Sequence, residues 1–330
     1  MKINKITKVL IIDFLKNHNN FLISAHASPE GDSLGAQLAF ARVIKKLGKN
    51  CDIINSDKHS REYNFLPGVE NIRSKPRIEK YDAVILLDCS DISRIGSVVN
   101  FIDKNLPILN IDHHISNQRF GYINLIDAKA SSVCEVLFLL FKELNLKIDK
   151  SIAINLYTGI LTDTGSFRYT NTSSVTHYVV SQLLKYGIDV PGVFKNIYQN
   201  LDVSDLKFIN SALANIKKDI SGKIAWVKIT HKLIRKYRPK IDLTDNILSF
   251  LRSLREAEAC ILFRERSGKE RNIRINLRSR GKIDANKIAQ HFGGGGHKTA
   301  SGITLRNTSL KKAEKLLIDF ILEKYKRLLS

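Results

Sequence analysis

Cysteine is scarce in this chain of 330 residues, and its four cysteines stand far apart, at positions 51, 89, 134 and 260. No Cys-x-x-Cys pair occurs, which argues against both a disulfide framework and a zinc ribbon. We therefore expect reduced cysteines, most of them buried as small core residues.

Long apolar runs are also missing. No stretch approaches the ~20 residues that a membrane-spanning helix needs. The start, Met1-Lys2-Ile3-Asn4-Lys5, leads into an amphipathic segment rather than a secretory signal. We expect a globular protein of the cytoplasm that has no membrane partner. The length of 330 residues and the 43% share of hydrophobic residues favour two domains, each with its own core.

Charge is unevenly distributed along the chain, and the basic excess lies in residues 191–330. Residues 191–330 hold 30 Lys and Arg against 13 Asp and Glu, a balance of +17, whereas residues 1–190 hold 23 against 19, a balance of +4. Lysine and arginine that neutralise phosphates supply much of the affinity for nucleic acid. The asymmetry indicates a polyanionic partner, although solvated helix faces would also carry such lysines.

Short apolar runs alternate with helical patterns in the first 190 residues, which is typical of βαβ units around a parallel sheet. We predict helices at 33–47, 131–144, 174–186 and about 193–216, a break at 187–192, strands at 223–230, 259–264 and 272–278, and a helix at 284–291. The predicted fold is α/β, with a parallel-sheet domain (1–190), a helical linker (191–220) and a smaller α/β domain (221–330).

Metal-competent side chains follow four apolar runs, each of which we interpret as a strand. These side chains are His26 with the nearby Glu30 and Asp32, then Asp88, then Asp112-His113-His114, then Asp163. Taken alone, the triplet would be an ordinary polar turn. Because the carboxyl ends of parallel strands meet at one edge of a sheet, we expect the four groups to converge. Carboxylate and imidazole without thiolate suit manganese, magnesium or zinc, and the excess of carboxylates favours the harder ions, manganese first.

A run of four glycines, Gly293, Gly294, Gly295 and Gly296, ends at His297. Glycine permits positive φ and close approach of the backbone to a ligand, so successive amides can form an anion-binding nest. A flexible linker is the alternative, but the run lies between an amphipathic helix and a further apolar segment. Period-two counting places Arg274, Arg278 and Arg280 on one face of the preceding strand, where guanidinium groups suit phosphate.

These motifs, in this order and spacing, resemble the DHH phosphoesterases that carry a DHH-associated C-terminal domain. The resemblance covers nearly the whole chain. Within that family, the two-domain length is most similar to the nanoRNase/pAp phosphatase branch. RecJ exonucleases are longer, and family II pyrophosphatases have a different second domain without a glycine-histidine loop.

The resemblance implies two Mn²⁺ ions, for which Mg²⁺ or Co²⁺ would be possible substitutes. One ion would be held by His26, Glu30 and Asp88, and the other by Asp32, Asp88, His113 and Asp163, so that Asp88 bridges them. Asp112 would orient its neighbours, and His114 would face the scissile phosphate. The family has aspartate where this chain has Glu30. We expect Glu30 to bind the metal. The alternative is that its extra methylene group loosens the first metal site.

The resemblance further implies that Arg278, the glycine loop, His297 and Ser301 hold a second phosphate of the substrate, with the active site in a cleft between the domains. The substrates would be short RNA oligonucleotides, cut to mononucleotides, and pAp, dephosphorylated to AMP; a homodimer is a further possibility. Two alternatives stay open at this point. One is hydrolysis of linear or cyclic dinucleotides, and the other is RNA binding with little catalysis.

Overall fold

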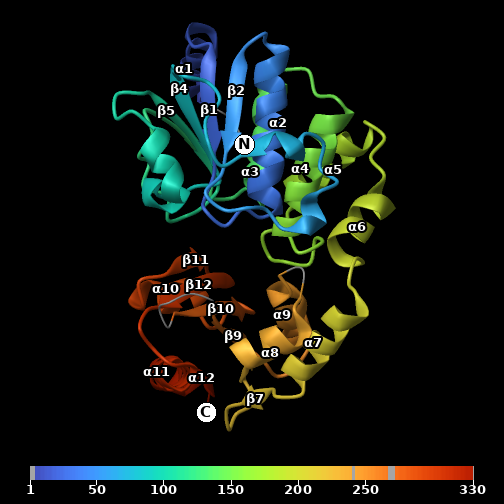
Figure 1. Ribbon diagram of the computed structural model, residues 1–330, viewed down its shortest axis with the longest axis vertical. Coiled ribbons are helices and arrows are strands. Elements are labelled where there is room, and N and C mark those ends of the chain that lie inside the picture. Colours follow the sequence, from blue (N-terminus) through green and yellow to red (C-terminus); the bar gives the residue numbers. More distant parts are fainter. Residues whose placement is uncertain (1–3, 240–241, 267–271, 330) are drawn as a thin grey trace. The chain divides into compact units, whose positions relative to one another are not determined.

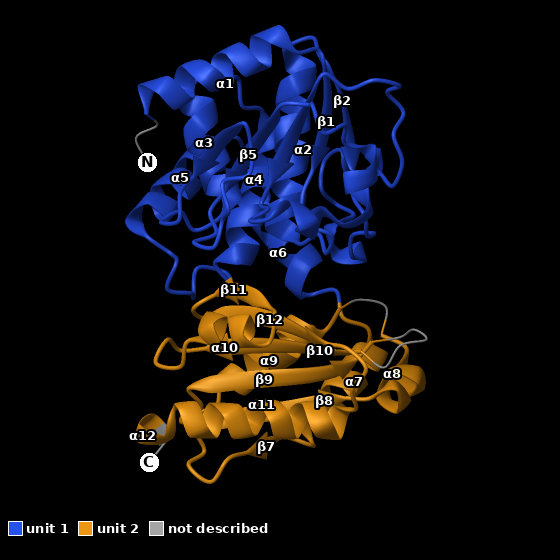
Figure 2. Cartoon of the chain, turned by 90° about the vertical axis from the view of Figure 1, so that its left-hand side faces the viewer, with its two compact units in different colours: residues 1–200 blue, residues 201–330 orange. Residues whose placement is uncertain are grey.

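The computed structural model describes residues 4–239, 242–266 and 272–329. The chain forms two compact units that divide between Asn200 and Leu201 (Figure 2). Each unit has its own β-sheet and its own buried core, so the expectation of an α/β protein with two cores is confirmed.

The first unit is built around a six-stranded sheet in the order β3-β2-β1-β4-β5-β6, and every strand pair is parallel. Its strands are β1 (Asn20–Ser24), β2 (Asn50–Ile54), β3 (Ile72–Arg73), β4 (Ala83–Leu87), β5 (Ile108–Asp112) and β6 (Ile123–Ile126). Its helices are α1 (Lys5–Asn17), α2 (Gly31–Lys46), α3 (Val133–Glu143), α4 (Lys150–Asp163), α5 (Ser174–Leu184) and α6 (Val190–Tyr198), with 3-10 turns η1 (Arg61–Tyr63), η2 (Val69–Asn71) and η3 (Ile92–Phe101).

Both faces of the first sheet are buried. Phe21 and Ile23 of β1 point into a core shared with α2, α3 and α4 (Figure 1). Leu22 points to the other face, where Ile95 and Val98 of η3 cover it. Burial on both faces explains why the central strands are continuous apolar runs rather than alternating ones, as is usual for parallel sheets.

The second unit contains a six-stranded sheet in the order β11-β12-β10-β9-β8-β7, in which only the β8–β9 pair is parallel. Its strands are β7 (Lys217–Lys218), β8 (Ile224–Ile229), β9 (Ala259–Glu265), β10 (Ile273–Ser279), β11 (Gly295–His297) and β12 (Ala300–Leu305). Its helices are α7 (Val203–Leu213), α8 (His231–Tyr237), α9 (Thr244–Arg252), α10 (Ala285–His291), α11 (Leu310–Lys324) and α12 (Lys326–Leu329). Helices α10 and α11 pack on one face of the sheet, and α7, α8 and α9 on the other.

The interpretation of residues 157–162 as a strand is wrong, because they lie inside helix α4. The helix begins after Asp149, whose carboxylate accepts a hydrogen bond from the Ile152 amide at 3.0 Å. Because this N-cap lies well before residues 157–162, the regular segment that begins there is too long to be a strand. Asp163 therefore stands at the end of a helix and not at the end of a strand.

The helix predicted at 193–216 is in fact two helices, α6 and α7. Asp202 precedes α7, and its own amide donates to the Asp205 carboxylate at 3.0 Å, so a new helix starts there. Pro191, which we interpreted as part of a break, lies in the first turn of α6, where the fixed φ of proline suits a helix.

The four cysteines are free, and Cys89, Cys134 and Cys260 are buried, as expected. Within the described residues, no helix combines the length and apolar character that crossing a bilayer would require.

Candidate active site

His26 and Asp88 mark the centre of the candidate site. They follow β1 and β4, the two strands at which the strand order reverses, and ligands of open α/β sheets bind at this switch point. His26 Nε2 lies 3.3 Å from Asp88 Oδ2. Asp88 has a left-handed backbone with φ of 53°, a conformation that aspartate tolerates better than most residues. The turn directs its carboxylate back over the end of the sheet.

His113 is surrounded by carboxylates. Its Nε2 lies 3.6 Å from Asp163 Oδ2, 3.7 Å from Asp88 Oδ1 and 3.8 Å from Asp32 Oδ2. Its Nδ1 lies 3.3 Å from the carbonyl oxygen of Ala130. If Nδ1 carries the proton and donates it to this carbonyl, the lone pair of Nε2 is directed toward the carboxylates. A backbone carbonyl behind the far nitrogen is the usual arrangement for a metal-binding histidine.

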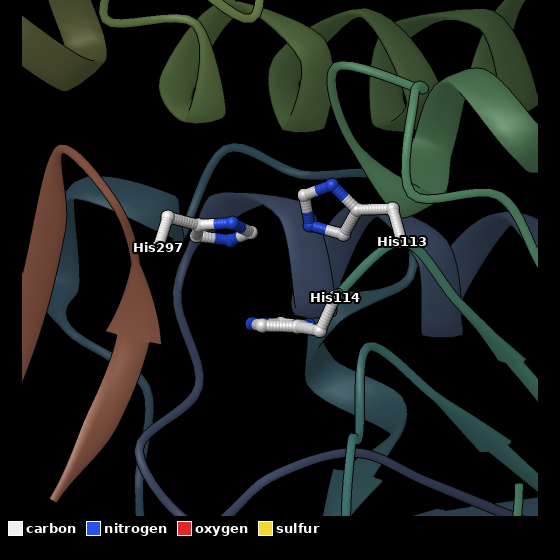
Figure 3. A group of neighbouring side chains, drawn as sticks. All are labelled: His113, His114 and His297. Atoms are coloured by element: carbon white, nitrogen blue, oxygen red, sulfur yellow. The ribbon is translucent and has the colours of Figure 1, made fainter. Parts of the chain in front are cut away.

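His114 is held by Asp112. Its Nδ1 lies 2.7 Å from Asp112 Oδ1 and 3.5 Å from Asp88 Oδ1, and its ring lies 5.0 Å from the ring of His113 (Figure 3). Asp112 is fully buried and also accepts from the side-chain amide of Asn117 at 2.6 Å. This arrangement fixes the orientation of the His114 ring, with Nδ1 on the Asp112 carboxylate.

Asp32 lies at the beginning of two helices. It is in the first turn of α2, and its carboxylate accepts from the amides of Val133 and Cys134, the first residues of α3, at 2.7 and 3.0 Å. The partial positive charge of helix N-termini favours a carboxylate there. A Cβ atom at Gly159 of α4 would lie 2.3 Å from Cys134 Sγ and 2.8 Å from Asp32 Oδ1. The glycine thus permits the close helix contact that brings Asp163, at the end of α4, to the site.

The charges of the buried cluster act strongly on one another. Burial and the neighbouring Asp88 raise the pKa of Asp32 to about 6, and burial raises the pKa of Asp163 well above its usual range. Burial acts to lower the pKa of His113, but Asp163, Asp32 and Asp88 outweigh it and raise this pKa to about 9. Burial acts to raise the pKa of Asp88, but the hydrogen bond from His26 outweighs burial and holds this pKa below its usual range. Protons therefore balance part of the negative charge.

The donor set fits divalent cations. Asp88 Oδ1 is buried and has no hydrogen-bond partner in the part of the chain that the structure describes, which is costly for a carboxylate oxygen unless a cation faces it. Among the described residues of the first unit, two groups of donors have all their ligand atoms within 4.8 Å of one another, namely Asp32 with His113 and Asp163, and Asp88 with Asp112, His113 and His114. Oxygen and imidazole donors of this kind hold manganese, magnesium or zinc.

Glu30 is the N-cap residue of α2 and is exposed. Its amide donates to Ser33 Oγ at 2.9 Å, which fixes the backbone. Its negative charge acts on both His26 and Asp163, so Glu30 belongs to the electrostatic surroundings of the cluster.

The glycine run of the second unit is partly a strand, which differs from the nest that we expected. Gly295–His297 forms β11 and pairs with β12. A Cβ atom at Gly294 would lie 2.2 Å from the Gly302 oxygen, and Gly296 has φ of 144°. These two glycines are required by the fold, whereas a Cβ atom at Gly295 would meet nothing within 4 Å. The hydroxyl of Ser301 donates to the His297 carbonyl at 2.8 Å.

The three arginines have different environments. Arg274 and Arg278 share a face of β10, as period-two counting predicts, and Arg278 forms an ion pair with Asp245 at 2.6 Å. The placement of Arg280 on this face is wrong, since β10 ends at Ser279. Arg280 donates to the carbonyls of Arg252, Leu254 and Arg255 and so caps the end of α9.

Two further residues, Asn117 and Asn110, belong to the surroundings of the site and were not predicted. Asn117 donates to Asp112, to Asn110 Oδ1 at 2.9 Å and to the Cys89 carbonyl at 3.1 Å. Asn110 donates to the carbonyls of Leu86 and Cys89. The sequence feature that indicates Asn110 is a polar residue inside an apolar strand, because a buried side-chain amide needs hydrogen-bond partners.

Comparison with known proteins identifies the family. The model of the DHH family, N-terminal domain, matches residues 20–160, and the model of the DHHA1 domain matches residues 234–326. The chain therefore carries a DHH N-terminal domain followed by a DHHA1 domain. The predicted resemblance is thereby confirmed, and the DHH match contains His26, Asp32, Asp88 and the Asp112-His113-His114 triplet.

Two curated relatives are similar to this chain along nearly the whole length of both sequences. "Bifunctional oligoribonuclease and PAP phosphatase NrnA" of Thermus thermophilus is 29% identical over 92% of this chain and 90% of its own. The protein of the same name from Mycoplasma genitalium is 29% identical over 93% and 94%. Among solved structures, an exopolyphosphatase-related protein from Bacteroides fragilis has a TM-score of 0.89 at 25% identity, covering 99% of this chain and 98% of that one. RecJ of Thermus thermophilus, solved with Mn²⁺, shares the fold with a TM-score of 0.56 at 12% identity, covering 96% of this chain and 54% of RecJ.

Proposed function

We propose that this DHH protein is a metal-dependent phosphoesterase that degrades short RNA oligonucleotides to mononucleotides and removes the 3′-phosphate of pAp. The observation that carries the proposal is the cluster of the buried Asp32, Asp88 and His113 with the half-buried Asp163 at the switch point of the first sheet. The names and the nearly full-length similarity of the NrnA relatives support the choice of substrates.

We assign metal binding to six side chains, namely His26, Glu30, Asp32, Asp88, His113 and Asp163. Asp88 is the bridging ligand in this assignment, because it lies near both His26 and His113. Manganese is our first choice, and the Mn²⁺ in the RecJ structure is consistent with it. Two bound cations would supply Lewis-acid chemistry, polarising a water molecule and neutralising the phosphoryl oxygens.

His114 is the proposed proton donor. Its Nδ1 is engaged with Asp112, so Nε2 is the nitrogen that would stabilise negative charge or protonate the leaving oxygen. Asp112 would hold the ring and its tautomer in place, with Asn117 securing the far oxygen of the same carboxylate. The chain thus supplies orientation and proton transfer at a defined atom.

The second unit is the proposed holder of the remaining substrate phosphate. Arg278, Gly293, Gly294, Gly295, Gly296, His297 and Ser301 are the residues that we assign to this role. The ion pair of Arg278 with the largely exposed Asp245 would open when a phosphate binds. A homodimer and a cytoplasmic location stay predictions.

A substrate panel tests the proposal. The protein is incubated with end-labelled RNA of two to five nucleotides, with pAp, and with linear and cyclic dinucleotides, each with Mn²⁺ and with chelator. We expect metal-dependent release of mononucleotides and of AMP. Preference for a cyclic dinucleotide would replace the proposed substrate class, and salt-sensitive RNA binding without product would indicate that Glu30 disables the first metal site.

A further inference from the structure

Arg94 of the first unit lies beside the metal-binding loop but has no part in the assignment above. It belongs to η3, and its carbonyl accepts a hydrogen bond from the amide of Ala27 at 2.7 Å. Ala27 directly follows His26. A Cβ atom at Gly96 would lie 3.1 Å from the Ala27 Cβ, which shows how closely the start of η3 packs on this loop.

The loop between Asp88 and Arg94 is also fixed from the side of His114. The amide of Gln118 donates to the Ser90 carbonyl at 2.9 Å, and its side chain donates to the Asp91 carboxylate at 2.5 Å. Asn117 donates to the Cys89 carbonyl at 3.1 Å. The backbone that carries Arg94 is therefore held by the segments that bear the site histidines His26, His113 and His114.

Arg94 is exposed, and among the described residues its guanidinium makes one hydrogen bond, from Nη1 to Ser90 Oγ at 3.0 Å. Asp91, the nearest acid in sequence, is already occupied by the Ser93 amide and Gln118. Ser90 is buried and stands two positions after Asp88, so its hydroxyl holds the Arg94 guanidinium at the loop that carries the site carboxylate. An arginine has five N–H donors, and most of those on Arg94 remain for a ligand.

We propose that Arg94 binds the scissile phosphoryl group of the substrate. Cations in the site would be balanced largely by the carboxylates that hold them, so the negative charge of the phosphoryl oxygens needs a further donor. A guanidinium on a rigid loop suits this need, because its fork matches phosphate oxygens and little reorganisation is required. The inference rests on the proposed phosphoesterase function and adds a substrate ligand from the first unit.

The test compares Arg94→Ala and Arg94→Lys with Arg77→Ala and Arg77→Lys. Arg77 is also exposed, but it precedes the amino end of β4, and its amide binds Asp52. We expect Arg94→Ala to lower kcat/KM by roughly tenfold to a hundredfold. The factor should be similar for pAp, a dinucleotide and a tetranucleotide, because all of them share the scissile phosphate. Arg94→Lys should recover part of the loss, and the Arg77 variants should match the wild type.

Calorimetric titration of the Mn²⁺-loaded protein with inorganic phosphate gives a second measurement. Arg94→Ala should weaken phosphate binding by a similar factor while leaving the affinity for Mn²⁺ unchanged. Unchanged phosphate binding, or an equal loss of Mn²⁺ affinity, would overturn the inference. If the wild type cleaves no substrate, the proposed function fails, and the phosphate titration still decides whether Arg94 is an anion ligand.

Ser90 provides an internal check, since its hydroxyl contacts the Arg94 guanidinium. We expect Ser90→Ala to lower kcat/KM modestly in the wild type and to have no effect in the Arg94→Ala background. Equal effects in both backgrounds would show that Ser90 acts independently of Arg94 and would remove this support.

Discussion

Asp112 Oδ1 lies 2.7 Å from His114 Nδ1, while its other oxygen accepts from Asn117. Asparagine at position 112 has one carbonyl oxygen, so it cannot accept from both neighbours at the same two positions. We expect Asp112→Asn to lower kcat for pAp by roughly tenfold to a hundredfold and to leave Mn²⁺ binding in place, as measured by steady-state kinetics and calorimetry. Asp57→Asn, at an exposed position, is the control, and wild-type kcat in the Asp112 variant would refute the orienting role.

Asp88→Asn tests the bridging ligand without disturbing the backbone, because asparagine also tolerates the left-handed conformation at this position. We expect no turnover of any substrate. Mn²⁺ should raise the melting temperature of the wild type but not that of the variant, since binding to the native state alone stabilises it. Turnover in Asp88→Asn comparable to that of the Asp57→Asn control would rule out a bridging carboxylate.

Two glycines of the same loop should respond differently to alanine. Gly294→Ala would place Cβ 2.2 Å from the Gly302 oxygen, whereas Gly295→Ala meets nothing within 4 Å. We expect Gly294→Ala to lower the melting temperature of the second unit. Gly295→Ala should keep the melting temperature and raise KM for pAp, because only an approaching phosphate would meet the new methyl group. A KM that stays at the wild-type value in stable Gly295→Ala would argue against phosphate binding at this glycine.

Gly159→Ala should damage stability and metal affinity together. Its Cβ would meet Cys134 Sγ and Asp32 Oδ1, and overpacking of a buried contact costs about 1–3 kcal/mol. Urea unfolding with and without Mn²⁺ measures both effects, and Ser151→Ala, in the first turn of the same helix, is the control. A loss of stability with unaltered Mn²⁺ affinity would show that Asp32 is not a ligand or that it adjusts freely.

Glu314 gives the second unit a defined acid sensitivity. It accepts hydrogen bonds from Trp226 Nε1, Lys217 and Lys228. Burial acts to raise the pKa of Glu314, but these bonds outweigh it and lower the pKa to about 2 from the ordinary 4.5. Because the folded pKa is the lower one, this stabilisation is fully present above pH 4.5 and is lost as the pH falls through about 2.

The only tryptophan of the chain is Trp226, so its fluorescence reports unfolding of this unit. We expect the unfolding free energy of the wild type to fall between pH 4.5 and 2 by at most about 3 kcal/mol more than that of Glu314→Gln. Glu323→Gln, at an exposed position of the same helix, should behave like the wild type. Equal pH dependence in the Glu314 variant would contradict the assignment.

Local patterns were sufficient to predict much of this molecule. The apolar runs that become β1, β4 and β5 are buried on both faces. Burial on both faces requires apolar side chains at consecutive positions, which the sequence shows directly. The polar residues that end these strands, His26, Asp88 and Asp112, were found for the same reason, because a strand end is a local change from apolar to polar.

The sequence alone therefore established the α/β class, the strand ends and the family resemblance. Tertiary structure decided that Asp163 reaches the site on helix α4, that Asp32 binds the amides of α3, and that half of the glycine loop is a strand. These outcomes depend on contacts such as that between Asp32 and Val133, 101 residues apart. Packing energies between distant segments select such contacts, and no local pattern of residues encodes them.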